Sequence, residues 1–147
     1  MSNLDYNIEI IKNNDLKEIE KIGEDSLPIY YEYNYLFYIL KMDNFLCYKL
    51  IFENKIIGFV IIEILDNNSR FHIMSFAILK EYRKKGFGKK IIDFVKKKKK
   101  IITLNVQKSN EIALKFYLKN DFKVKKIMEN YYTNLNESTA YSMEYNL

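Results

Sequence analysis

The sequence is poor in the residues that form disulfides, metal sites and flexible linkers. Its 147 residues include one cysteine, one histidine, one proline, four glycines and no tryptophan. A single cysteine excludes an internal disulfide and suggests a reducing compartment. Because Cys47 lies inside the apolar run Phe45 to Phe52, we expect a buried small side chain rather than a nucleophile. With one histidine and one cysteine, no structural zinc site is expected.

Long apolar runs and a leader-like start are missing as well. No apolar run approaches the roughly 18 to 20 residues that a membrane-spanning helix needs. Residues 1–5 lack the charged-then-apolar pattern of an export signal. We therefore expect a soluble, cytoplasmic protein with neither DNA nor a membrane as partner. The net charge of +5 suits an anionic ligand, although a composition rich in lysine produces the same charge.

The apolar pattern predicts one domain over residues 1–147 in which strands and helices alternate. The expected strands are Tyr6–Lys12, Phe45–Phe52, Lys55–Leu65, Arg70–Leu79, Ile101–Val106, Phe122–Met128 and Thr139–Asn146. The expected helices run from Asp15 to Gly23, from Tyr33 to Lys41, after Gly88, and from Ser109 or Asn110. Asp15 and Glu18 form a capping-box-like pattern at the first helix. This order predicts an α/β fold with a mixed sheet of about seven strands and helices on both faces.

The most informative motif is the glycine-rich turn from Arg83 to Gly88, which reads Arg-Lys-Lys-Gly-Phe-Gly. It follows the apolar run Phe71 to Leu79 and precedes an amphipathic helix. Such a turn leaves backbone N–H groups unpaired at a helix start, where the helix dipole favours a phosphate or pyrophosphate. Lys89 and Lys90 add positive charge nearby. The alternative is an ordinary strand-to-helix turn with a solvated basic surface.

This turn and a second segment together resemble the GNAT superfamily of acetyl-CoA-dependent N-acetyltransferases. The family's pyrophosphate loop reads Arg/Gln-x-x-Gly-x-Gly/Ala, and residues 83–88 match it in full. In the second segment the residues that fall at the family's spacing are Asn110, Ala113, Phe116, Tyr117 and Phe122. Asp121 stands where most members have glycine. The resemblance implies that acetyl-CoA is the cosubstrate. The residues implied to hold it are Phe76, Ala77, Ile78, Arg83, Lys84, Lys85, Gly86, Phe87, Gly88, Lys89, Asn110 and Tyr117.

Four further segments resemble the family of catalytic subunits of N-terminal acetyltransferase E. They are Leu27 to Tyr31, Arg70 to Met74, Leu104 to Gln107 and Asn130 to Tyr132. The resemblance implies acetylation of protein N-termini that start with Met, often before an apolar residue. It also implies that the protein can work beside a larger acetyltransferase complex at the ribosome. The residues implied to bind the peptide N-terminus are Leu27, Pro28, Ile29, Tyr31, Tyr131 and Tyr132.

Two catalytic positions depart from that family. His72 stands where the family has a tyrosine, and Asn105 stands where it has a histidine; in the family these side chains position a water that takes the amine proton. We hypothesise that His72 is the base, directly or through a water that Asn105 orients. The alternative is a histidine that only packs between sheet and helix. Tyr117 is the expected acid for the leaving CoA thiolate, unless its ring merely fills the core.

An α-amine acceptor is compatible with the changed catalytic residues at positions 72 and 105. A free α-amine with a pKa near 7.7 to 8.0 is roughly a tenth to a third neutral at about pH 7.2, whereas lysine is neutral at roughly one part in a thousand. An enzyme for N-termini therefore loses less from a weak base. We expect the oxyanion to be stabilised by a backbone N–H near Met74 to Phe76, where the family has a bulged strand edge.

Three alternatives remain open from the sequence. The acceptor could instead be a lysine side chain or a small-molecule amine. The protein could also be a weakly active CoA-binding subunit of a larger acetyltransferase complex, since both departures fall on catalytic positions. The lysine run Lys96 to Lys100 is read as a solvated turn, with contact to the ribosome or to RNA as the alternative.

Overall fold

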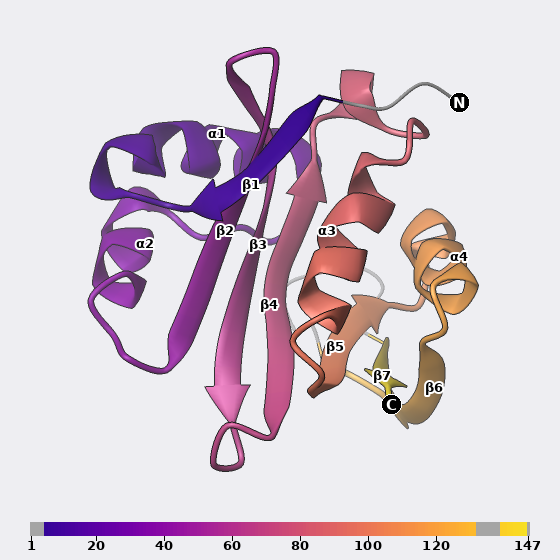
Figure 1. The fold of residues 1–147 in the computed structure, drawn as a ribbon. Helices are drawn as coiled ribbons and strands as arrows, with labels where there is room; N and C mark the ends of the chain where they lie inside the picture. Colours follow the sequence, from indigo (N-terminus) through magenta and orange to yellow (C-terminus); the bar gives the residue numbers. More distant parts are fainter. Residues whose placement is uncertain (1–4, 132–138, 147) are drawn as a thin grey trace.

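The computed structural model describes residues 5–131 and 139–146, and its centre is a seven-stranded mixed sheet (Figure 1). The strands are β1 (Tyr6–Ile10), β2 (Phe45–Phe52), β3 (Lys55–Leu65), β4 (Arg70–Ile78), β5 (Ile101–Gln107), β6 (Lys123–Met128) and β7 (Ala140–Tyr145). The helices are α1 (Leu16–Ser26), α2 (Tyr33–Ile39), α3 (Phe87–Lys96) and α4 (Glu111–Lys119), with short 3-10 turns at Asn13–Asp15 and Lys80–Tyr82. The spatial order is β1-β2-β3-β4-β5-β7-β6. This architecture confirms the predicted fold class and order of elements.

Helices cover both faces of the sheet, because successive strand side chains point to opposite faces. On one face α1 and α2 bury Ile19 and Leu36 against Phe59 of β3. On the other face α3 buries Ile92 against Val60 of β3. Figure 1 shows α3 and α4 on the near side of the sheet. Within the described ranges, no helix is both long and apolar enough to cross a membrane.

The sheet is interrupted between β4 and β5, which are its one parallel pair in the described ranges. Their pairing runs from Arg70–Ile101 to Ile73–Leu104 and then stops, although both strands continue. Just beyond this point Met74 bulges out of the β3–β4 register, since Ile73 pairs with Ile62 and Ser75 with Ile61. A bulge bends its strand and re-aims neighbouring groups. The bulge expected near Met74 is therefore confirmed, and the two strands diverge from it.

The prediction that α1 ends at Gly23 is wrong. The helix continues to Ser26, and Leu27 N–H still donates to Gly23 O at 2.9 Å. A Cβ on Gly23 would lie 3.1 Å from Cβ of Tyr30. Gly23 therefore lies inside the helix, where the absence of a side chain lets Tyr30 pack closely against it.

The predicted capping role of Asp15 is also wrong. Its side chain makes no cap hydrogen bond to α1. Instead Oδ2 accepts from Lys12 N–H at 2.8 Å and from Lys49 Nζ at 2.6 Å. Both side chains of the Lys49–Asp15 pair are largely buried. Asp15 therefore neutralises a lysine that lies under α1.

The lysine run after α3 is only partly a solvated turn. Lys97 and Lys99 are exposed, as expected. Lys96 is 15% exposed, however, and its Nζ donates to Asn120 O at 2.7 Å while lying 4.5 Å above the ring of Tyr145. Lys96 thus joins the end of α3 to the end of α4.

Candidate active site

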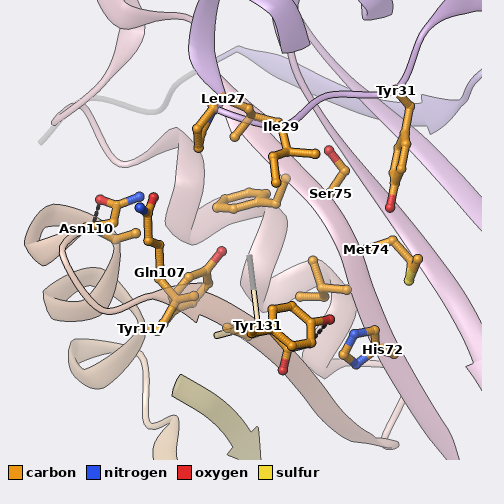
Figure 2. A pocket seen from close by; sticks show the side chains of 17 residues that line it. Leu27, Ile29, Tyr31, His72, Met74, Ser75, Gln107, Asn110, Tyr117 and Tyr131 are labelled. Atoms are coloured by element: carbon orange, nitrogen blue, oxygen red, sulfur yellow. Dashed lines mark hydrogen bonds between the residues drawn. The ribbon is translucent and has the colours of Figure 1, made fainter. Parts of the chain in front are cut away.

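The gap between β4 and β5 opens into a pocket of about 460 Å³ (Figure 2). Residues from the loop after α1, from β4, β5 and α4, and from the segment after β6 meet there. The predicted site residues that line it are Leu27, Pro28, Ile29, Tyr31, His72, Phe76, Asn105, Asn110, Tyr117 and Tyr131. Tyr132, also predicted, lies outside the described residues. The pocket therefore unites the three catalytic candidates with most of the residues predicted to bind the peptide, whereas the predicted cofactor residues Ala77, Ile78 and 83–89 do not line it.

The two sides of the pocket differ in character. Figure 2 shows Leu27 and Ile29 on one side, with His72 and Tyr131 across from them. Ile29 and Tyr131 are 41% and 48% exposed, which places apolar and aromatic surface at the mouth. Side chains to which the sequence assigned no role, among them Ser75 and Gln107, also line the pocket. These residues could be recognised as pocket residues only by knowing where β4 and β5 separate, and the sequence does not reveal that point.

His72 is held at one ring nitrogen. Its Nδ1 lies 2.7 Å from Oγ1 of Thr103, and Nη1 of Arg70 donates to the same oxygen at 3.4 Å. Burial lowers the pKa of His72, and the Arg70 cation lowers it further against the opposing effect of Glu63. The imidazole is therefore neutral at neutral pH, which is the protonation state that a general base needs.

Tyr117 combines a packed ring with access to the pocket. The residue is 8% exposed, and its ring lies 5.4 Å from Phe116 and 5.5 Å from Phe122. Figure 2 shows its hydroxyl turned toward the pocket. A phenol O–H can donate a hydrogen bond or a proton to a negatively charged group. The ring thus belongs to the core while the hydroxyl faces the pocket.

Asn110 has a structural task that the sequence predicted. Its Oδ1 accepts from Ala113 N–H at 3.1 Å and so caps α4. The residue also lines the pocket. This capping bond fixes the start of α4, and with it the helix that carries Tyr117.

The glycine-rich turn provides backbone donors rather than side chains. The first ladder bond of α3 runs from Lys90 N–H to Gly86 O at 3.1 Å, so the N–H groups of Phe87 to Lys89 precede the ladder. Phe87 is buried in the core. Arg83 Nε donates to Ile78 O at 2.8 Å, which ties the turn to the end of β4. These features fit an anion held by the helix start.

Ala77 and Ile78 point into the two cores. Ala77 packs with the α1–α2 face and Ile78 with the α3 face, and both are less than 10% exposed. Only their backbone groups can meet a ligand in the gap beside β4. Cys47 is likewise buried, and burial raises the pKa of its thiol to about 12. The expectation that Cys47 is not a nucleophile is thus supported by its environment.

Two parallel strands that diverge beside a glycine-rich helix start are the arrangement expected of an enzyme that transfers an acyl group from coenzyme A. Residues 13–122 match the family described as "Acetyltransferase (GNAT) family". The chain belongs to this family and is an acetyltransferase, an enzyme whose cosubstrate is acetyl-CoA.

Individual relatives are similar to this chain at 21 to 28% sequence identity. An N-alpha-acetyltransferase of Saccharolobus solfataricus is 28% identical over 144 residues, covering 87% of this chain and 86% of the relative. N-alpha-acetyltransferase 50 of Danio rerio is 28% identical over 141 residues, covering 90% of this chain and 83% of the relative. The solved structure of Arabidopsis thaliana Naa50 with the bisubstrate analogue CoA-Ac-MVNAL superposes with a TM-score of 0.84 at 21% identity, covering 97% of this chain and 99% of that chain. This structural likeness establishes the shared fold.

Proposed function

We propose that this protein transfers the acetyl group of acetyl-CoA to the N-terminal α-amine of proteins, preferring Met followed by an apolar residue. The observation that carries the proposal is the pocket, where the candidate base His72 faces an apolar wall built by Leu27 and Ile29. The names of the relatives support the α-amine as acceptor. The analogue bound to the Arabidopsis relative carries Met and then Val, which supports the preference.

Acetyl-CoA would reach the pocket along the gap between β4 and β5. Its pyrophosphate would meet the backbone amides from Lys84 to Lys89, which lie at the positively charged start of α3. Its pantetheine arm would pass the unpaired edge of β4 and the side chain of Asn110. The acetyl group would then lie near Tyr117. This path uses the backbone of Phe76 to Ile78.

The chemistry needs one bond formed and one broken. The neutral amine attacks the thioester carbon, the C–N bond forms, and the C–S bond breaks with the electrons left on sulfur. His72 accepts the amine proton, while Tyr117 donates a proton or a hydrogen bond to the thiolate. A backbone N–H at the Met74 bulge stabilises the oxyanion formed between these steps. Asn105, which also lines the pocket, would orient the water where the proton reaches His72 through one.

The peptide would be recognised by shape and by hydrogen bonds. Leu27, Pro28 and Ile29 offer apolar surface to the first side chain, and Met suits such a wall because its thioether adapts to irregular space. Tyr31 and Tyr131 can hydrogen-bond the peptide backbone through their phenols. We propose the same task for Tyr132. A cytoplasmic location beside a larger acetyltransferase complex at the ribosome completes the proposal.

One assay tests the proposal. CoA release from acetyl-CoA is measured with peptides that start Met-Leu, Met-Lys, Ser and Ala, and with an internal-lysine peptide whose N-terminus is blocked. Turnover restricted to the Met-starting peptides is expected. Turnover of the blocked peptide would instead identify a lysine acetyltransferase, and CoA binding without turnover of any peptide would identify a non-catalytic subunit.

A further inference from the structure

A short polar contact in the pocket region joins two strands. His72 of β4 and Thr103 of β5 are Cα partners in the short parallel ladder, one step before its last pair. Their side chains lie on the same face of the sheet, with Nδ1 of His72 2.7 Å from Oγ1 of Thr103. His72 lines the pocket, whereas Thr103 is 7% exposed and does not line it. Thr103 therefore contacts the imidazole without itself facing the substrate space.

A hydroxyl is a particular kind of partner for an imidazole. It can donate to a bare ring nitrogen or accept from a protonated one. When a histidine takes up a second proton both of its ring nitrogens become donors, and the buried one then needs an acceptor. Oγ1 of Thr103 can supply that acceptor by rotating its own hydrogen away. Valine, which has the same shape, cannot.

We propose that Thr103 is a positioning residue for the acetyl transfer: it accepts the Nδ1–H of His72 and thereby leaves Nε2 as the nitrogen that takes the amine proton. This inference rests on the proposed function. The N–H proton of the attacking amine passes to Nε2, and the resulting imidazolium is held through Nδ1–H on Oγ1. Departure of the CoA thiolate completes the transfer. The imidazolium then returns its proton to water.

The charged groups around His72 and Thr103 favour the neutral imidazole, which is the form that can accept a proton. Arg70 of β4 reaches the same threonine oxygen, Glu63 of β3 is the Cα partner of His72, and Glu144 of β7 is the Cα partner of Thr103. Arg70 is also bound to Asp66 at 2.7 Å. A carboxylate in direct contact with Nδ1 would hold the imidazolium; a hydroxyl with a guanidinium behind it lets the proton leave again.

The test uses the full chain with substitutions at Thr103 and Arg70. With Thr103→Val we expect kcat at saturating peptide and acetyl-CoA to fall about tenfold, the size of one lost hydrogen bond, with both KM values within twofold. In the plot of kcat against pH, the acidic limb should move to lower pH. The reason is that Thr103→Val removes the hydrogen-bond acceptor of the imidazolium and so disfavours the protonated form of His72. Thr103→Ser should restore kcat to within threefold. Arg70→Gln should move the acidic limb to higher pH, whereas the matched control Asp66→Asn, which keeps the cation, should not.

A second measurement does not depend on turnover. The chain has a single histidine, so one set of imidazole signals in a nitrogen-15 NMR titration reports the tautomer and pKa of His72. We expect the proton on Nδ1 in the wild type and in Thr103→Ser. A proton resident on Nε2, or a Thr103→Val enzyme with unchanged kcat and acidic limb, would overturn the proposal. If no peptide is acetylated but the tautomer is as expected, the proposed function fails and the Thr103–His72 pairing stands.

Discussion

The side-chain nitrogen of Asn105 donates a hydrogen bond of 2.9 Å to the phenol oxygen of Tyr131. The bond joins β5 to the segment that follows β6, and both residues line the pocket. The sequence hypothesis assigned Asn105 a water to orient. In the structure its amide nitrogen holds a tyrosine from the proposed peptide-binding wall.

Asn105→Ala should weaken peptide binding more than it slows chemistry. Loss of one hydrogen bond corresponds to about 0.5 to 1.5 kcal/mol, or roughly two- to tenfold in an equilibrium constant. We expect KM for a Met-Leu peptide to rise by about this factor, while KM for acetyl-CoA stays within twofold. Initial-rate kinetics with each substrate varied in turn measure both.

Tyr131→Phe removes the same bond from the other side. The double variant should therefore lose less than the sum of the two single changes, because they share one interaction. Strictly additive effects on peptide KM would show that the Asn105–Tyr131 bond does not serve peptide binding.

Tyr117→Phe should separate catalysis from stability. The ring contacts with Phe116 and Phe122 remain, so the variant should keep its packed core, which thermal denaturation checks. We expect kcat to fall by about 10²-fold, the lower end for general acid catalysis, because a thiolate with a conjugate-acid pKa near 8.5 is a stable leaving group. Single-turnover measurement of CoA release reports this step. Tyr145→Phe is the matched control, since Tyr145 lies on β7 against Phe122 and does not line the pocket. Equal kcat values for the two variants would remove Tyr117 from the mechanism.

The two glycines of the turn should respond differently to alanine. A Cβ on Gly88 would lie 3.2 Å from the ring of Phe116, so Gly88→Ala must displace that ring beside the cofactor path. We expect KM for acetyl-CoA to rise on the order of tenfold. Gly86 has φ of 91° and no atom within 4 Å of an added Cβ, so Gly86→Ala should lower the free energy of unfolding by about 1 to 2 kcal/mol through backbone strain. Titration calorimetry with CoA and urea denaturation distinguish the two. A Gly88→Ala enzyme with normal CoA affinity would contradict the proposed path.

The pH dependence of stability should report His72. Its pKa in the folded protein is lowered, chiefly by burial, so the unfolded chain binds more protons as pH falls below about 6.5. The stabilisation is present above that pH and is lost as pH falls through the folded-state pKa. Urea denaturation between pH 7 and pH 5 should show a steeper loss for the wild type than for His72→Gln. Parallel curves would mean that the folded protein does not depress this pKa.

The sequence predicts the ends of the active site better than its centre. The turn from Arg83 to Gly88 is recognisable because glycine spacing and a following helix act locally. The apolar loop from Leu27 to Ile29 is recognisable for a similar reason. The pairing of His72 with Thr103, in contrast, depends on the register between two strands that are separated by α3. The bulge at Met74 depends on pairing with β3.

Two wrong predictions have the same origin. Gly23 and Asp15 both carry local signals for helix ends, and both are used instead for contacts with distant residues. Gly23 makes room for Tyr30, and Asp15 pairs with Lys49 of β2. In each case a tertiary contact takes precedence over the local pattern.

Because the ladder between β4 and β5 is interrupted, the two parts of the sheet are hydrogen-bonded to each other at only one end. Residues 70–73 and 101–104 pin its two halves together at one end, and beyond them the strands part. Any spreading of the halves is a rotation about that pinned end, so displacement is least at the pivot and greatest at the far opening. His72 and Thr103 lie at the pivot, and the glycine-rich turn lies toward the opening. A rotation of this kind would change the proton-transfer geometry at the narrow end less than the width of the gap at the other end.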